Sequence, residues 1–202
     1  MHKEVLSENQ IKLLPLIKSF SLDFGLVGGT AIALHLGHRR SIDFDLFTNK
    51  EFLNSKIRNK IKNNHSIQAT LIDEPDELTL VSANVKLTFY KYPYKINYLD
   101  KFEDIIKTPD LLTLAAMKAF ALGGRAKWKD YVDIFFVLRN CKLEDVTERS
   151  REIFGSEFNE RLFREQLSYY EDIDYSEKIG YLDDKEVPDN EIKQKLSELS
   201  LK

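Results

Sequence analysis

The sequence is short of cysteine and has no long hydrophobic run, and both shortages limit what the protein can be. Cys141 is the single cysteine among 202 residues, so neither an internal disulfide nor a thiolate metal cage can form. This excludes disulfide-rich secreted scaffolds and zinc ribbons, and it favours a reducing, cytoplasmic setting. No stretch approaches the roughly 20 apolar residues that cross a bilayer, and residues 1–9 lack the basic and apolar segments of a leader. We therefore expect a soluble, unexported protein without a membrane partner.

Glycine and proline are also scarce, with 8 and 5 residues, which excludes collagen-like and low-complexity chains. Hydrophobic residues make up 43% of the sequence, enough to bury a core. A length of 202 residues predicts one globular unit, or one with a small appendage.

Charge is distributed unevenly along the chain. Residues 1–140 hold 20 Lys and Arg against 16 Asp and Glu, whereas residues 141–202 hold 10 against 17. The basic front suits ligands that carry phosphate. The acidic tail is consistent with a solvated helical surface, which we favour, with a face for a partner, or with a screen against non-specific RNA.

The hydrophobic pattern predicts an α/β fold, in which a small mixed sheet is followed by a helical C-terminal half. We expect an α/β core over residues 1–107 and a helical domain over residues 108–202 that completes an active-site cleft. Strands are predicted at residues 24–28, 41–47, 67–72, 78–82 and 85–90. Helices are predicted at residues 11–20, 31–36, 52–61, 111–122, 128–138 and 189–199. We expect the first helix to be capped by Ser7 with Gln10, and to be kinked or shortened by Pro15. Residues 143–167 show amphipathic helical patterns, and residues 168–190 are poorly patterned.

Two carboxylates lie on the predicted strand at residues 41–47. The period-two alternation there puts Asp43 and Asp45 on the same face of the strand, close enough to share a divalent cation. Like charges at this spacing repel each other, so the pair needs a cation or a basic partner. The sequence is consistent with a Mg²⁺ site, or with an exposed strand face neutralised by Arg39 or Arg40.

A glycine turn precedes this strand. Gly28, Gly29 and Thr30 follow an apolar strand and open a helix, where exposed N–H groups and the helix dipole favour a phosphate. The alternative is an ordinary tight turn with Thr30 as a helix cap. Together, the turn and the carboxylate pair describe a site for a nucleoside triphosphate (NTP) and its magnesium.

The same residues resemble a known family. The segments Gly28-Gly29-Thr30, Arg39, Ser41 and Asp43-Phe44-Asp45 resemble the signature of DNA polymerase beta-like nucleotidyltransferases, and in particular of the AbiEii/AbiGii toxins. The downstream helical signature of these toxins is matched, in order, by Lys118, Arg125 and Lys129-Asp130-Tyr131-Val132-Asp133. The resemblance covers about residues 24–138. It implies transfer of a nucleoside monophosphate from an NTP to RNA such as tRNA, by a toxin with a cognate antitoxin.

The resemblance also implies roles for individual residues. Asp43 and Asp45 would coordinate Mg²⁺, residues 28–30 would hold the terminal phosphates, and Lys118 would neutralise the triphosphate from the far side. Apart from the resemblance, the residues leave two roles open for Arg39 and Arg40, which are contact with phosphate and balance of the two aspartates. The nucleotide would lie between the sheet and the helical half.

Asp130 and Asp133 would lie on one helical face, as candidates to orient or deprotonate the attacking group, one of them having only a structural role. Thr88 stands where many polymerase beta-like enzymes carry a third carboxylate. Without that carboxylate, the site could bind either one metal ion or two. The basic residues 56–62 are a candidate RNA contact. The alternatives are transfer to a small molecule such as an aminoglycoside, and a non-catalytic domain that binds a nucleotide or a partner.

Overall fold

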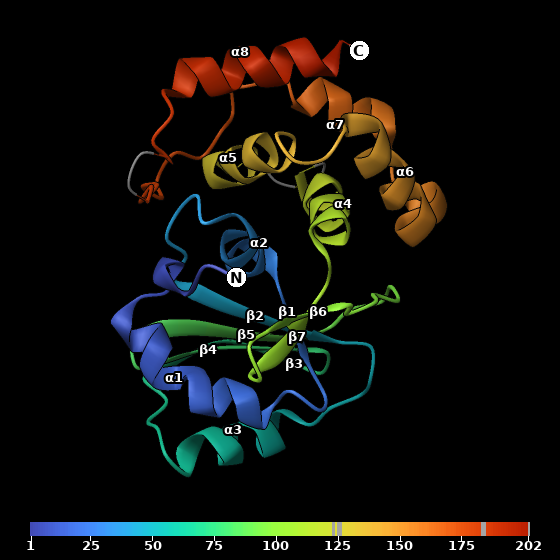
Figure 1. The fold of residues 1–202 in the computed structure, drawn as a ribbon. Helices are drawn as coiled ribbons and strands as arrows, with labels where there is room; N and C mark the ends of the chain where they lie inside the picture. Colours follow the sequence, from blue (N-terminus) through green and yellow to red (C-terminus); the bar gives the residue numbers. More distant parts are fainter. Residues whose placement is uncertain (123, 125–126, 183–184, 202) are drawn as a thin grey trace.

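The computed structural model describes residues 1–122, 124, 127–182 and 185–201. In it, a five-stranded sheet lies between two layers of helices (Figure 1). β2 and β5 pair in parallel, and the other neighbours are antiparallel, so the sheet is mixed, as predicted. The strands, in spatial order, are β1 (Gly25–Val27), β2 (Asp43–Thr48), β5 (Val85–Lys91), β4 (Glu77–Ser82) and β3 (Ala69–Glu74).

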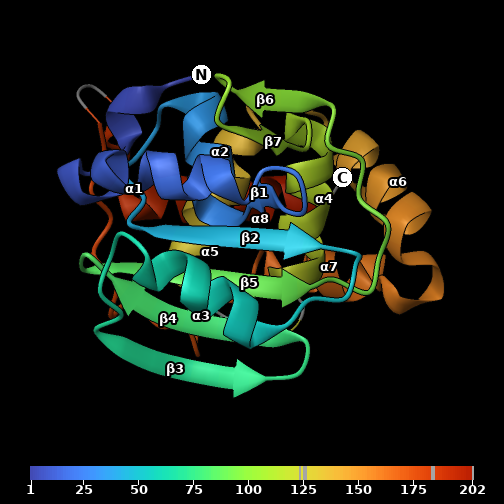
Figure 2. The same cartoon turned by 90° about the horizontal axis from the view of Figure 1, so that it is seen from below.

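Two helices cover one face of the sheet, and the remaining helices lie on the other side (Figures 1 and 2). The first face carries α1 (Glu8–Ser19) and α3 (Asn54–Lys62). On the opposite side, α2 (Gly28–Leu36) lies next to the sheet and contacts α4 (Leu111–Leu122) and α5 (Trp128–Val137). Beyond these lie α6 (Leu143–Phe154), α7 (Glu160–Gln166) and α8 (Asp189–Ser200). Short 3₁₀ turns occupy Lys3–Val5 and Gly155–Glu157.

Local sequence signals account for the ends of several elements. The Ser7 hydroxyl accepts a hydrogen bond from the Gln10 backbone N–H at 3.2 Å, and the Ser7 N–H donates to the Gln10 side chain at 3.0 Å. This reciprocal capping box starts α1, as predicted. The helix then continues past Pro15 to Ser19, so the proline does not end it.

The alternation along β2 fixes the direction of its carboxylates. Phe44 and Leu46 are fully buried, whereas Asp43 and Asp45 are partly exposed on the other face of the strand. Phe89, paired with Leu46 on β5, packs against Phe20 at the end of α1, with ring centroids 4.8 Å apart. The apolar face of β2 therefore points to α1, and the two aspartates point to the side of α2.

The sequence did not predict the short ribbon of β6 (Asp100–Phe102) and β7 (Ile106–Thr108). Strands of three residues are too short to show an alternating pattern. In the described part of the chain, no helix is both long and apolar enough to cross a membrane.

Candidate active site

A hollow of about 430 Å³ lies where the start of α2, the start of β2 and a segment near residue 180 meet. It collects residues that are far apart in the sequence. Among those lining it are Gly28, Gly29, Arg39, Arg40, Asp43, Asp45, Lys86, Lys118, Lys127, Lys129 and Glu177. The structure thus brings the predicted glycine turn, carboxylate pair and Lys118 to one place.

The glycine turn allows a close approach between α2 and β2. Gly28 has a φ of 73°, in the left-handed region that favours glycine, and a Cβ there would collide with Asp45 Oδ2. A Cβ on Gly29 would come within 2.7 Å of Arg39 Nη2. No side chain caps the first turn of α2, so its N–H groups are not used by a cap and are suited to an anion.

The collision at Gly28 predicts a stability difference between two alanine variants. Gly155 also has a positive φ, of 57°, but nothing lies within 4 Å of a Cβ there. Both Gly28→Ala and Gly155→Ala should cost about 1 kcal/mol for the backbone. Gly28→Ala should cost about 1–3 kcal/mol more, because the methyl group must displace Asp45. Urea denaturation of both variants measures the difference, and equal losses would contradict the collision.

Thr30 lies inside α2 and does not cap it, so the alternative that it serves as a helix cap is wrong. It is 1% exposed, and its hydroxyl is within 2.7 Å of the Ser41 hydroxyl and donates to the carbonyl of Asp43. These contacts tie α2 to the start of β2. Thr30 therefore positions the aspartate strand, and its contact with a nucleotide stays a prediction.

The basic partner of Asp43 comes from the neighbouring strand. Lys86 faces Asp43 across the parallel β2–β5 pair, with its Nζ 2.8 Å from Asp43 Oδ2. Burial lowers the pKa of Lys86, but the hydrogen bond to Asp43 and the negative charges of Asp43 and Asp45 together outweigh burial and raise the pKa overall. The Arg39 guanidinium is paired with Asp133, so neither of the two roles expected of Arg39, contact with phosphate or balance of the aspartates, is its main contact here, and both stay predictions. The sequence missed Lys86, since its role depends on strand register.

Thr88 faces Asp45 in the same register, so the neighbouring strand offers a hydroxyl at that position and no carboxylate. Within the described residues, no group of three or more His, Cys, Asp and Glu side chains could hold a metal on its own. Two carboxylates nevertheless fit Mg²⁺, which proteins often bind through one or two carboxylates completed by water and substrate phosphates.

Asp133 is the centre of a buried charge network. Its carboxylate accepts hydrogen bonds from Arg39 Nε at 2.7 Å and Arg39 Nη2 at 2.8 Å, and Lys118 Nζ lies 3.1 Å away. His38 Nε2 lies 2.9 Å from the same carboxylate. Burial favours the protonated acid, but the charges of Arg39 and Lys118 hold the pKa of Asp133 well below its usual range. A carboxylate so enclosed is a weak base, which favours a positioning role for Asp133 over proton abstraction, and its role in the reaction stays a prediction.

Asp130 and Lys118 extend this network toward the hollow. Lys118 Nζ lies 2.7 Å from Asp130, which is fully buried, and the lysine itself is 5% exposed. Burial lowers the pKa of Lys118, but the charges of Asp133 and Asp130 raise it overall, so the ammonium stays charged. Lys118 lines the wall of the hollow, and its expected contact with a triphosphate stays a prediction. Arg125, the remaining residue of the helical signature, lies outside the described residues.

Other residues singled out in the sequence lie away from the hollow. The basic helix α3 is on the opposite face of the sheet (Figure 1).

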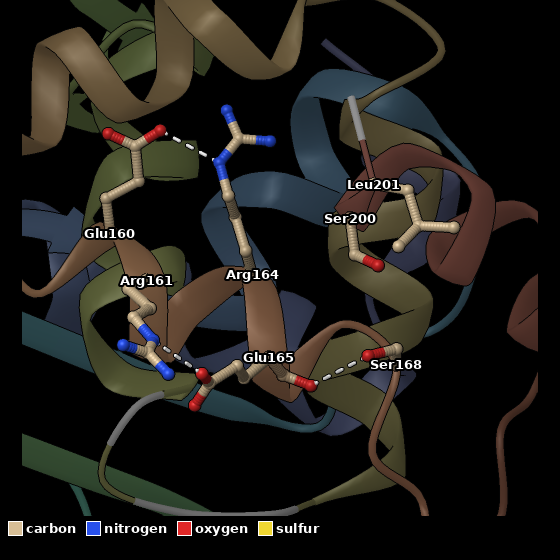
Figure 3. Close-up of a pocket in the computed structure, with 7 residues that line it drawn as sticks. All are labelled: Glu160, Arg161, Arg164, Glu165, Ser168, Ser200 and Leu201. Atoms are coloured by element: carbon tan, nitrogen blue, oxygen red, sulfur yellow. Dashed lines mark hydrogen bonds and ion pairs between the residues drawn. The ribbon is translucent and has the colours of Figure 1, made fainter.

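A second hollow, of about 460 Å³, lies between α7 and the end of α8 (Figure 3). Its charged side chains pair with each other one helical turn apart. Arg161 Nε lies 2.8 Å from Glu165, and Arg164 Nε lies 2.9 Å from Glu160. Such pairs are typical of a solvated helix face. They agree with the favoured interpretation of the acidic tail.

The chain matches a family model over residues 17–198, described as "Nucleotidyl transferase AbiEii toxin, Type IV TA system". The protein belongs to this nucleotidyl transferase family. The resemblance drawn from residues 24–138 is therefore confirmed, and the match extends through the helical half. A curated relative, "Uncharacterized protein aq_aa25" of Aquifex aeolicus (strain VF5), is 33% identical over 126 residues. The alignment covers 58% of this chain and 58% of that relative's length.

Solved structures of nucleotidyltransferases share the fold. MenT4, a nucleotidyltransferase toxin from Mycobacterium tuberculosis H37Rv, superposes with a TM-score of 0.66 at 12% identity, covering 95% of this chain and 81% of that one. The antibiotic-resistance factor ANT(2'')-Ia superposes with a TM-score of 0.51 at 12% identity, covering 71% and 90%. The predicted mixed α/β fold is confirmed by these likenesses.

Proposed function

We propose that this family member transfers a nucleoside monophosphate from an NTP to an acceptor, with Mg²⁺ bound by Asp43 and Asp45. One observation carries the proposal: the two carboxylates face a glycine turn at a helix N-terminus, in a hollow that also exposes lysines. Carboxylates for a metal and N–H groups and cations for phosphates are what nucleotidyl transfer requires.

The chain's own residues prepare the metal site. Lys86 holds the Asp43 carboxylate from the neighbouring strand, and the absence of a side chain on Gly28 leaves room for the Asp45 carboxylate. Mg²⁺ bound there would neutralise charge on the attacking and leaving oxygens. The Gly28-Gly29 turn would hold terminal phosphates, and Lys118 would face them across the hollow.

The proposed acceptor is RNA, such as tRNA. A hollow of about 430 Å³ is in the lower half of the range for ligand pockets, roughly 300–1,000 Å³, and suits a single nucleotide. An RNA presents only one end to such a hollow, whereas a small-molecule acceptor must be enclosed together with the nucleotide. The size of the hollow therefore favours RNA. Lys127, Lys129 and Lys178 on the lining add the positive charge that attracts a phosphate backbone. The family's description as a toxin supports a cognate antitoxin as a further partner.

Transfer of label from α-labelled NTPs tests the proposal. The protein is incubated with total RNA, or with an aminoglycoside, and with each of the four NTPs in turn, in Mg²⁺ or in excess chelator. We expect label on RNA from a preferred nucleotide, and none in chelator. Label on the aminoglycoside alone would mean that the acceptor is a small molecule and not RNA. Nucleotide binding without transfer to either acceptor would favour a non-catalytic domain.

A further inference from the structure

A segment of the acidic tail, residues 173–182, lies across the hollow and is held at both ends by backbone contacts. At one end, the Trp128 N–H donates to the Asp174 carbonyl at 3.0 Å. At the other, the Arg40 N–H donates to the Gly180 carbonyl at 2.7 Å, and the Leu182 N–H donates to the His38 carbonyl at 3.2 Å. We call residues 173–182 the crossing segment.

Between these two ends, Glu177 carries a carboxylate into the hollow. It accepts a hydrogen bond from Lys127 Nζ at 2.8 Å and another from Lys129 Nζ. Glu177, Lys127 and Lys129 line the same hollow as Asp43 and Asp45. One carboxylate of the chain thus lies between two lysines, beside the proposed metal ligands.

We propose that Lys127 and Lys129 form a subsite for a phosphate group of the nucleotide, and that Glu177 occupies this subsite until the nucleotide displaces it. The inference rests on the proposed function, since it assigns one of the phosphate contacts of that site. It makes the crossing segment an internal competitor of the substrate.

The contacts of two further lysines of the hollow, Lys86 and Lys118, support this assignment. Lys86 is paired with Asp43, and Lys118 is paired with the buried Asp130 and Asp133, so both are held by carboxylates that belong to the core of the site. Lys127 and Lys129 instead share a carboxylate from a surface segment. A phosphate offers this pair more charge and more acceptor oxygens than one carboxylate does.

The exchange takes place where solvent reaches the ion pairs. The side chain of Glu177 is 39% exposed, that of Lys127 is 38% exposed and that of Lys129 is 20% exposed, and solvent weakens ion pairs that are exposed to this degree. The backbone contacts at Asp174 and Gly180 do not involve the carboxylate, so Glu177 can turn away while the segment stays attached.

The charge state of Glu177 fits a competitor better than a catalytic base. Burial would raise its pKa, but the hydrogen bonds from Lys127 and Lys129 lower it to about 2. The carboxylate is therefore ionised at neutral pH and is a poor proton acceptor. Like a phosphate, it is an anion whose oxygens accept hydrogen bonds from cationic donors.

Binding of inorganic tripolyphosphate, measured by calorimetry on the full chain, tests the inference. Glu177→Gln removes the competing charge and should tighten binding by about three- to tenfold. Glu171→Gln, an exposed residue of the same acidic stretch that does not line the hollow, should leave the affinity unchanged. Lys129→Met should weaken binding, and the double variant Lys129→Met with Glu177→Gln should regain little of the lost affinity. Thermal unfolding of each variant checks that the fold is kept.

Equal or weaker binding by Glu177→Gln would overturn the inference, as would the absence of tripolyphosphate binding in every variant. The inference would also be overturned if Glu177→Gln increased the tripolyphosphate affinity as much in the Lys129→Met variant as in the wild-type protein. Tripolyphosphate has no nucleoside and cannot support transfer, so this result is independent of the proposed function. If wild-type protein labels RNA while Glu177→Gln gains no affinity, only the subsite fails. If Glu177→Gln gains affinity while no NTP supports transfer, only the proposed function fails.

Discussion

Asp45→Asn should lower the kcat/KM for nucleotidyl transfer by at least about 100-fold while the protein stays folded. Asparagine has the same shape as aspartate, so the close approach between this side chain and Gly28 is kept. The change removes a negative charge and one oxygen ligand from the proposed metal site. Metal stabilisation of charge in the transition state contributes several kcal/mol, and about 1.4 kcal/mol corresponds to a tenfold change in rate.

The matched control is Asp104→Asn. Asp104 pairs with Lys18, its side chain is 81% exposed, and it does not line the hollow. This variant loses the same charge and should keep full activity. Label transfer over a range of Mg²⁺ concentrations measures both variants, and circular dichroism checks their folding. Asp45→Asn retaining more than about a tenth of wild-type activity would contradict the role of Asp45 as a metal ligand.

The parts of this site that the sequence predicted depend on near neighbours in the chain. The alternation over residues 41–47 requires only that successive strand residues point to opposite faces, and it placed Asp43 and Asp45 correctly on one face. The glycines before a helical run likewise predicted a helix there, although α2 begins at Gly28 and not at the predicted residue 31. The helix predicted at 111–122 matches α4, because its apolar pattern is long and continuous.

The parts that were missed depend on distant pairing. Lys86 reaches Asp43 only because β2 and β5 pair in a particular parallel register, which no local pattern encodes. Glu177 lies in a stretch without periodicity, and backbone hydrogen bonds to residues near Arg40 bring it to the hollow. Neither residue has a local sequence signal that points to the site.

Asp133 shows a different limit of prediction from sequence, which concerns the role of a residue and not its position. The resemblance named it among the residues that could orient or deprotonate the acceptor, and the structure places it beside Lys118. Its burial, and its contacts with Arg39 and His38, decide what it can do there. A signature identifies which residues gather at a site, whereas solvent exposure and partners separate a reactive carboxylate from a supporting one.

Asp133→Ala should lower the free energy of unfolding by about 3–5 kcal/mol, because it leaves charged groups buried without their partner. Arg39 is 5% exposed and directs two nitrogens to this carboxylate, and Lys118, equally buried, lies within 3.1 Å of it. Urea denaturation measures the loss. Asp104→Ala, which breaks an exposed pair, should leave the urea midpoint unchanged.

A double-mutant cycle separates this network from a simple cavity effect. Arg39 pairs with Asp133 through two nitrogens. Arg39→Met removes this cation and keeps much of the volume of the arginine side chain. If the charges depend on each other, Asp133→Ala combined with Arg39→Met should cost less than the sum of the single variants, by about 0.5–3 kcal/mol. Additive losses would mean that Asp133 stabilises the fold through packing alone. Coupling would instead mean that the charge of Asp133 holds the Arg39 guanidinium in place.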